Sequence, residues 1–440
     1  MMFEAERYIY AHPQTGFKEW DAHNYLKNEF EKMGFTLTEA GNIPGFYFDI
    51  DTGKDGPTVA VLGELDALLV PSEDPEAEDD VCAKHACGHN CQVSALLGVA
   101  GVLRNPEILS RLCGKIRIVA VPAEEPTELS ERAARRDRGE IRFLSGKSEF
   151  VRRGYFNGVD IAVMVHTAHG DKSKFRFRKG GTSGVIAKRV TYYGSKGVGG
   201  SAPTNGVNAL YAAQTALNSI NALREVFPSS QNVRNQLIIS RGGDTVQHMP
   251  WNVVIESNVR ANSYTAMKSA NEKINRAYTA AAVAFGARVE IDDLDVYFPE
   301  RDYDNNPTLV ELGAAIAREI CGEDGIEFPT GTGSGGSDMG NLAAVIPCLQ
   351  ASSSGAGGKT HGASYYIKYP EFAVFNPSVL QTALVCTLLE GSAEKALEVI
   401  SDHKALFSSF EEYCREMDKM CRTKGTVEYS EDGKAVLSWT

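Results

Sequence analysis

The chain has 440 residues, more than one ordinary domain holds, so we expect two domains. Its 43% hydrophobic and 23% charged residues are typical of a globular protein rather than a disordered or fibrous one. The formal net charge of -12 and the lack of a basic cluster argue against a nucleic-acid partner.

The first part of the chain alternates predicted helices and strands. Apolar residues at helical spacing, ended by Gly34, predict a helix over 19–35. Strands are predicted over 45–50, 58–65, 114–122 and 159–166, and a helix over 91–103. This alternation predicts an α/β domain with a largely parallel sheet, in which functional groups gather at the carboxyl ends of the strands.

The pattern changes near residue 180. Strands are predicted over 184–194, 235–243, 252–263 and 287–296, and helices over 207–224 and 266–285. This β-α-β-β-α-β order is that of a ferredoxin-like α+β domain. We therefore predict a catalytic domain formed by 1–181 and 298–392, an inserted domain over 182–297, and a C-terminal extension over 393–440. The extension is charged and is expected to begin as a helix.

The N-terminal residues, the apolar runs and the cysteines indicate the cellular compartment in which the protein is expected. The first residues carry acids and no apolar core, so we expect no signal peptide. No apolar run approaches the roughly 20 residues that span a bilayer, so no membrane partner is expected. Nine cysteines in a long chain favour reduced thiols over a disulfide framework, which predicts a cytoplasmic protein.

The stretch "KHACGHN", residues 84–90, concentrates groups that bind metals. Cys87 and His89 lie two apart, so a regular helix would not let them face each other, but a turn at Gly88 would. A thiolate and an imidazole both suit a borderline divalent metal. The same residues are compatible with a buried structural cysteine and a histidine that caps the next helix.

Other candidate groups lie at predicted strand ends or in loops. Glu124 and Glu125 follow an apolar strand, and consecutive side chains of an extended chain point to opposite sides. One carboxylate can then reach a metal while the other faces substrate and water. His166 ends a strand and His361 lies in a glycine-rich loop, and together these groups favour a metal site.

The motifs resemble those of the dinuclear metallohydrolases that include aminoacylase and glutamate carboxypeptidase. The resemblance covers about residues 5–390. It rests on "YAHPQTGFKEW", "GELDAL", "KHACGHN", "PAEE", "GSDMGN" and "THGAS". The closest branch contains the hydrolases of hippurate, indole-acetyl amino acids and p-aminobenzoyl-glutamate, and Asn90 with "SDMGN" points to the last of these.

The resemblance implies a metal-dependent hydrolase of N-acyl amino acids or dipeptide-like substrates. Its metals would be two zinc, manganese or cobalt ions, held by Cys87, His89, Glu125, His166 and His361. Glu124 matches the general base, which would activate a water that bridges the metals. Asp66 matches an acid that orients a ligand. The inserted domain of the family serves as a lid and a dimer contact, so a homodimer is expected.

Three features depart from the family pattern. Val198 stands where the family has a lid histidine, and Gln247 and His248 stand in a second lid motif that normally has asparagine. We predict that Gln247 or His248 replaces part of that histidine's role. An arginine-rich insertion over 126–153 is either a solvated charged helix or a lid that selects acidic substrates.

Arg260 lies in a stretch that resembles the family's lid strand, whose arginine meets a substrate carboxylate. A surface or dimer-interface salt bridge is the alternative for this residue. Two other functions stay open for the chain, namely a cytosolic dipeptidase and a catalytically impaired metal-binding or scaffold homologue.

Overall fold

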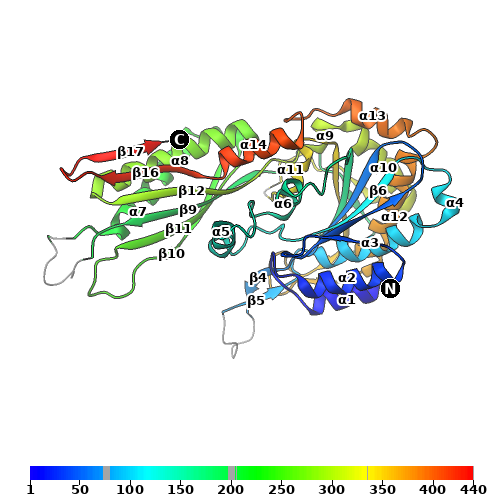
Figure 1. Cartoon of the computed structure of the whole chain (residues 1–440), viewed down its shortest axis with the longest axis horizontal. Helices are drawn as coiled ribbons and strands as arrows, with labels where there is room; N and C mark the ends of the chain where they lie inside the picture. Colours follow the sequence, from blue (N-terminus) through cyan, green and yellow to red (C-terminus); the bar gives the residue numbers. More distant parts are fainter. Residues whose placement is uncertain (73–79, 197–203, 205, 334, 440) are drawn as a thin grey trace.

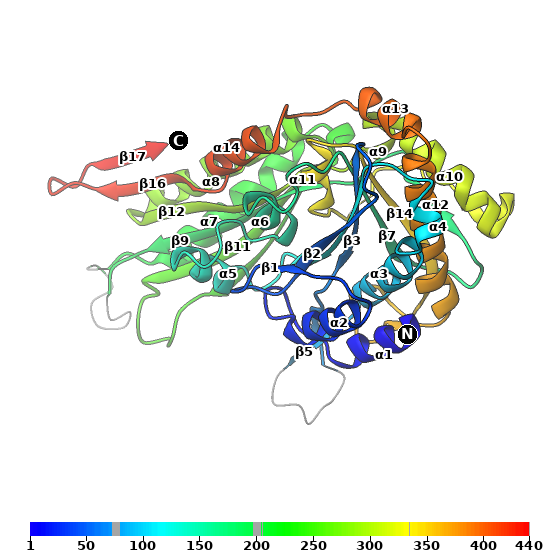
Figure 2. The same cartoon turned by 45° about the vertical axis from the view of Figure 1, so that its right-hand side comes forward.

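The protein is built around two large sheets that lie side by side, with helices packed against them (Figures 1 and 2). They are seen in a computed structural model that describes residues 1–72, 80–196, 204, 206–333 and 335–439. The first sheet has nine strands, in the order β1-β2-β6-β3-β7-β14-β8-β13 with β15 paired to β14. Its strands are β1 Thr38–Glu39, β2 Phe46–Asp51, β3 Thr58–Glu64, β6 Lys115–Val121, β7 Ile161–His169, β8 Phe175–Arg176, β13 Ile326–Glu327, β14 Cys348–Gly357 and β15 Tyr366–Ile367.

The middle of this sheet is parallel, as the alternating pattern predicts. The pairs β3–β6, β3–β7 and β7–β14 are all parallel, whereas β2 runs antiparallel to β6. Both faces of β3 are buried. Val59 and Val61 belong to one apolar cluster, and Ala60 and Leu62 belong to the other. Burial on both faces is what a central parallel strand requires, and it explains the continuous apolar run.

Helices cover this sheet, and the predicted ones are present with small shifts. They are α1 Met2–Ala11, α2 Trp20–Lys32, α3 His89–Leu103, α4 Pro106–Leu109, α6 Gly146–Arg152, α9 Asp302–Asn305, α10 Pro307–Cys321, α11 Met339–Ala343 and α12 Asn376–Leu389. Helix α5 Leu129–Asp137 packs instead against the second sheet, at β9 Gly184–Tyr193. The helix predicted to start at Cys91 starts at His89, and the strand predicted to end at His166 continues to His169. A short hairpin, β4 Leu68–Pro71 with β5 Val81–Lys84, stands apart.

The second sheet belongs to a lid domain, by which we mean β9 to β12 with the two helices that cover them. Its elements are β9 Gly184–Tyr193, α7 Ala209–Ala222, β10 Arg234–Arg241, β11 Asn252–Ala261, α8 Tyr264–Phe285 and β12 Arg288–Tyr297. The strands pair antiparallel in the order β10-β11-β9-β12, which is the ferredoxin-like arrangement predicted from the sequence. Every second residue of β11 is buried, so one face of the sheet meets the helices.

The C-terminal extension is part of both layers rather than a free tail. It begins with α13 Glu394–Asp402 and α14 Phe410–Met420, as expected for its start, but then forms β16 Thr423–Tyr429 and β17 Ala435–Trp439. Strand β16 pairs with β12, so the hairpin adds two strands to the lid sheet. On α14, the buried Tyr413 hydroxyl lies 2.9 Å from Ser148 Oγ and from Asn341 Nδ2. The extension therefore connects the lid domain to the first sheet's layer.

One helical stretch among the described residues has the length and composition of a membrane span. It runs from Glu371 to Leu389, with a mean hydropathy of 1.6. The expectation that no apolar run approaches 20 residues is therefore wrong for this stretch. The helix packs against α3 and α10, and Leu380, Leu384 and Leu388 are buried in the core. Its apolar character is accounted for by its place inside the protein.

The arginines of the 126–153 insertion make contacts within the protein. Arg135 pairs with Glu140, Arg142 pairs with Asp418, and Arg152 and Arg153 both pair with the buried Glu149. Arg132 is buried and donates to the Leu144 carbonyl at 3.0 Å. None of these side chains lines the large cleft described below. The geometry thus disfavours a substrate-selecting lid, and it also differs from a simple solvated helix.

Candidate metal centre

A cleft of about 820 Å³ lies between the carboxyl ends of the parallel strands and the open face of the lid sheet. It is lined by residues from both layers. From the first sheet and its loops come Cys87, Glu124, Glu125, His166, His169, Arg176, Arg178, Glu300, Asp302, Gln350, Ser352, Thr360 and His361. From the lid domain come Arg234, Gln236 and Arg260. Most of the predicted site residues therefore meet in one cavity.

A tight turn lets Cys87 and His89 converge. Gly88 between them has φ +87°, a left-handed conformation that residues with a Cβ rarely adopt. A Cβ at this position would lie 2.6 Å from Thr167 Cβ and 2.7 Å from the Tyr365 hydroxyl. His89 then opens α3, so its side chain is held at the start of a rigid helix. Both side chains are buried.

Potential ligand atoms gather in two groups that share Cys87. The first is Cys87, His89 and His166, and the second is Cys87, Glu125 and His361, each with its atoms within 4.8 Å of one another. Cys87 Sγ lies 3.2 Å from His166 Nε2 and 3.4 Å from His361 Nε2, and Glu125 Oε1 lies 3.4 Å from His361 Nε2. Two adjacent positions with a common sulfur ligand are compatible with two metal ions.

The chemistry of these groups fits transition metals. His89 Nε2 and Glu125 Oε1 are buried and make no well-aligned hydrogen bond among the described residues, and their nearest polar neighbours are Glu64 Oε2 at 3.1 Å and His361 Nε2 at 3.4 Å, both possible metal ligands themselves. Buried polar atoms without a partner are costly, so a ligand for them is expected. Burial also raises the pKa of the Cys87 thiol, so a thiolate at this place needs a cation beside it. Sulfur, nitrogen and carboxylate donors together suit zinc or its neighbours better than calcium or magnesium.

Asp66 orients two of these groups. Its Oδ1 lies 3.0 Å from His89 Nδ1, and its Oδ2 accepts from the Glu125 backbone N–H at 2.9 Å. Although burial opposes it, the hydrogen bond from His89 lowers the pKa of Asp66 to about 2. The Asp66 contact directs the proton of His89 to Nδ1 and leaves Nε2 free to bind a metal.

Glu124 has the environment of a proton acceptor. Its Oε2 lies 3.9 Å from His89 Nε2, and its backbone carbonyl accepts from the Tyr297 hydroxyl at 2.7 Å. Burial, together with the charges of Glu64 and Glu125, raises the pKa of Glu124 well above its ordinary range. A raised carboxyl pKa is typical of groups that take up and release protons near neutral pH.

Backbone strain is concentrated beside the same groups. Ala123, which precedes the glutamate pair, has φ +53°, and His361 has φ +57°. Left-handed conformations of residues other than glycine cost energy and cluster at functional sites. The Ala123 N–H donates to Glu19 at 2.7 Å and the His361 N–H donates to the Ala86 carbonyl at 2.9 Å, and these bonds hold the strained loops in place.

Sequence reasoning missed a buried charge cluster behind the centre. Lys147 Nζ lies 2.5 Å from Glu64 Oε1 and 2.5 Å from Asp338 Oδ1, and all three side chains are buried. Glu64 Oε2 in turn lies 3.1 Å from His89 Nε2, so Glu64, His89 and Glu124 form a third group of possible ligands. Glu64 is the last residue of β3 and stands two residues before Asp66, and side chains two apart in an extended chain share a face, which is the signal that could have found it.

The structure does not bring every predicted site residue to the cleft. Arg260 lines it from β11. Gln247 and His248 are exposed in the β10–β11 connection, which Figure 1 places at the end of the lid domain away from the first sheet. They are not among the residues that line the cleft. Val198 lies outside the described residues.

Comparisons with known proteins find peptidases and amino acid hydrolases. The sequence profile of peptidase family M20/M25/M40 matches residues 60–375. The Xaa-Arg dipeptidase of Mus musculus is 27% identical over 78% of this chain and 73% of its own. An IAA-amino acid hydrolase (ILR1-like 2) of Arabidopsis thaliana is 24% identical over 73% and 70%. A dinuclear metal-binding M20 peptidase of Bacillus subtilis superposes with a TM-score of 0.62 at 19% identity, over 88% of this chain and 97% of its own.

Proposed function

The chain belongs to peptidase family M20/M25/M40, and we propose that it hydrolyses the amide bond of an N-acyl amino acid or a dipeptide-like substrate. The observation that carries the proposal is Glu124, a buried carboxyl that lies beside two groups of metal-binding atoms in one cleft. Family members act on amide bonds with the help of metals, so the chain is a metal-dependent hydrolase. The proposed ligands are Cys87, His89, Glu125, His166 and His361, for two ions of zinc, manganese or cobalt.

The roles of the side chains follow from their positions. When bound, such metals lower the pKa of water and polarise a substrate carbonyl. Glu124 takes the proton of the attacking water and later passes it to the leaving amine. Asp66 keeps His89 in the orientation and tautomer that leave Nε2 available. Arg260 holds the carboxylate of the leaving amino acid, because a guanidinium binds a carboxylate with two parallel hydrogen bonds.

A substrate panel tests the proposed reaction and the role of Arg260. Wild-type protein loaded with manganese or zinc should hydrolyse N-acyl amino acids or dipeptides with a free carboxylate, and their C-terminal amides much more slowly. Arg260→Lys should raise KM for the acids by about 10- to 100-fold, since a charged hydrogen-bond pair contributes about 1.5–3 kcal/mol. The amides should change little. Equal effects on acids and amides would remove the carboxylate role of Arg260.

The panel also separates the remaining alternatives. Turnover of dipeptides but not of N-acyl amino acids would favour the cytosolic dipeptidase. Metal binding without turnover of any substrate would favour an impaired homologue, with Val198 as its explanation. The intact constellation of Glu124 and the five proposed ligands supports an active enzyme. The odd number of cysteines, all free, supports a cytoplasmic location.

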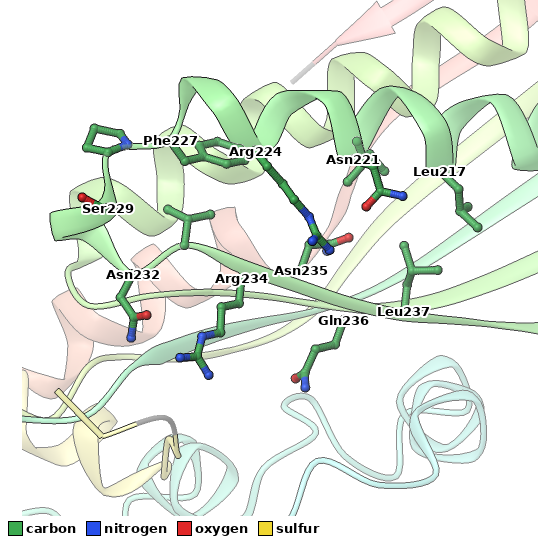
Figure 3. A pocket seen from close by; sticks show the side chains of 13 residues that line it. Leu217, Asn221, Arg224, Phe227, Ser229, Asn232, Arg234, Asn235, Gln236 and Leu237 are labelled. Carbon is green, nitrogen blue, oxygen red and sulfur yellow. The ribbon is translucent and has the colours of Figure 1, made fainter.

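We also propose a homodimer through the β10 edge of the lid sheet. Strand β10 has no neighbour on its outer side within the described chain, and Ile238 is 60% exposed there. A cavity of about 780 Å³ lies between this strand and the chain around α7 (Figure 3). An open strand edge with exposed apolar residues is a template for pairing with another chain. Because Gln247 and His248 lie far along the lid domain, their contact with substrate is proposed to come from a second copy.

Two substitutions on the two edges of the lid sheet test this dimer. Ile238→Lys on β10 should convert dimers to monomers in light scattering, whereas Leu437→Lys on β17, where Leu437 is 55% exposed, should leave them intact. His248→Ala should keep the dimer but lower kcat, as expected for a contact made in the transition state. A monomeric wild type, or an unchanged kcat in both His248→Ala and Gln247→Ala, would contradict these proposals.

A further inference from the structure

A lysine is fully buried behind the candidate metal centre. Lys147 is 0% exposed and lies between two carboxylates that are also buried, those of Glu64 and Asp338. A lysine is almost never fully buried unless it is paired, and a buried ion pair adds little net stability because its charges must leave water. The roles proposed above do not include these three residues, so the cluster calls for another explanation than stability.

Asp338 and the start of α6 fix the place of this lysine. Asp338 binds Lys147 twice, with Oδ1 2.5 Å from Nζ and Oδ2 2.8 Å from the backbone nitrogen. Gly146, the first residue of α6, lets the helix approach the loop that carries the glutamate pair, since a Cβ on it would lie 1.6 Å from the Pro122 carbonyl oxygen. The ammonium group is therefore held in one place, beside Glu64.

Glu64 stands within reach of an ion bound to His89. Its Oε2 lies 3.1 Å from His89 Nε2. Two donors that share one tetrahedral zinc ion lie about 3.4 Å apart, because each bond is about 2.1 Å long. A free carboxylate at this distance would take a position on the ion, and a catalytic metal needs one position open for water.

Both oxygens of Glu64 are bound by other groups of the protein. Lys147 Nζ lies 2.5 Å from Oε1, and Gln92 Nε2 donates to Oε2 at 2.9 Å. The Gln92 side chain is itself held, because its Oε1 accepts from the Glu64 backbone N–H at 3.2 Å. The negative charge of Glu64 is thus balanced by an ammonium group, which weakens its attraction for a second cation.

We propose that Lys147 is a positioning residue that binds Glu64 and keeps this carboxylate from coordinating the metal, so that one position stays open for the attacking water. The inference rests on the proposed metal-dependent hydrolysis and adds a residue to it. Lys147 does not line the cleft, so it acts only through Glu64. The five proposed ligands stay as they are, and Glu64 is excluded from their number.

Lys147→Met, which has a similar length but no charge, should release Glu64 to the metal. In the cobalt-loaded protein the visible absorption bands should shift, because they report the donor atoms around the ion. The variant should also lose cobalt to a chelator more slowly than wild type, and its kcat should fall by about 10- to 100-fold. Loss of an ordinary supporting contact would weaken metal binding instead, so faster loss of cobalt or an unshifted spectrum would overturn the proposal.

Glu64→Gln completes a double-mutant cycle with this variant. Alone, it should leave the metal content unchanged, whereas loss of an ion would show that Glu64 is a ligand and would overturn the proposal. In the Glu64→Gln background, Lys147→Met should leave the cobalt spectrum as it is and change kcat by less than about threefold, since no carboxylate is released. The loss of the partner of Asp338 is common to both backgrounds and cancels. Equal effects of Lys147→Met in both backgrounds would reduce Lys147 to a structural residue.

Lys188→Met is the matched control. Lys188 is also 0% exposed and pairs with the buried Asp293, but both lie in the lid domain and neither lines the cleft. Its substitution should lower the Tm and leave the cobalt spectrum unchanged. A spectral shift as large as that of Lys147→Met would mean that any lost buried charge disturbs the centre, and it would contradict the specific role of Lys147.

A second variant covers the case in which Lys147→Met alone does not fold. Lys147→Met combined with Asp338→Asn removes one of the two carboxylates left without a partner, and it should show the same spectral shift and slower loss of cobalt. These metal measurements need no turnover. A lack of hydrolysis with every substrate would therefore overturn the proposed reaction alone, whereas an unshifted cobalt spectrum would overturn the role of Lys147.

Discussion

Glu124→Gln should lower kcat by about 10²–10⁴-fold or more while the metal content of the protein stays the same. Glutamine has nearly the shape of glutamate but cannot accept the proton of the attacking water. The raised pKa of Glu124 and its place beside His89 support the role of proton carrier rather than metal ligand. Steady-state kinetics together with metal analysis of the same preparation measure both parts of this result.

Glu125→Gln is the matched variant, one residue along the chain. Burial acts to raise the pKa of Glu125, but the contact with His361 outweighs it and the pKa is lowered, so Glu125 is present as a carboxylate. Loss of that charge should weaken metal binding, and added metal should restore part of the activity. Glu124→Gln should show no such recovery. If the two variants exchanged these behaviours, the roles of the pair would be reversed.

Cys87→Ala combined with His361→Ala should abolish most metal binding. Cys87 belongs to both groups of ligand atoms, and His361 belongs to the second, so the pair of substitutions leaves neither position complete. Wild-type protein should bind up to two transition-metal ions per chain, measured by elemental analysis after dialysis. Activity should fall with the metal content, because each ion depends on its complete set of donors.

The control for this experiment is Cys113→Ala. Cys113 is also a buried free cysteine, but it lies in the apolar core and belongs to no group of ligand atoms. Its substitution should leave the metal content unchanged even if it costs some stability. Full retention of metal in the Cys87 and His361 double variant would show that the ions, if any, bind elsewhere.

The elements that could be predicted from the sequence are those whose pattern is local. The strand over 58–65 was predictable because a continuous apolar run indicates burial on both faces. The β-α-β-β-α-β order was predictable because apolar residues repeat about every 3.6 positions in a helix and every second position in a strand. The types of ligand were readable for a similar reason. Gly88 between Cys87 and His89 indicates a turn, and Glu124 follows a strand that ends at Val121.

Contacts between distant segments were not readable in this way. A lysine inside an arginine-rich insertion gives no local sign that it will lie between Glu64 and Asp338, because these ion pairs form only when the starts of α6 and α11 pack beside the end of β3. The C-terminal hairpin is similar. Its sequence is compatible with a strand but does not indicate a partner. Strand β16 becomes part of the lid sheet only because β12 offers an open edge beside it.

By itself, then, the sequence determined which segments form helices and strands and that they build two layers, and it predicted the groups that are proposed to hold metals. The helices and strands depend on residues close together in the chain. The tertiary structure alone decided which arginines face the cleft, because the facing of Arg234 and Arg260 depends on the register of two strands and on which side the helices cover. Among the arginines of the insertion, Arg135 and Arg153 pair with glutamates of the insertion itself, whereas Arg142 pairs with Asp418, which only packing brings beside it.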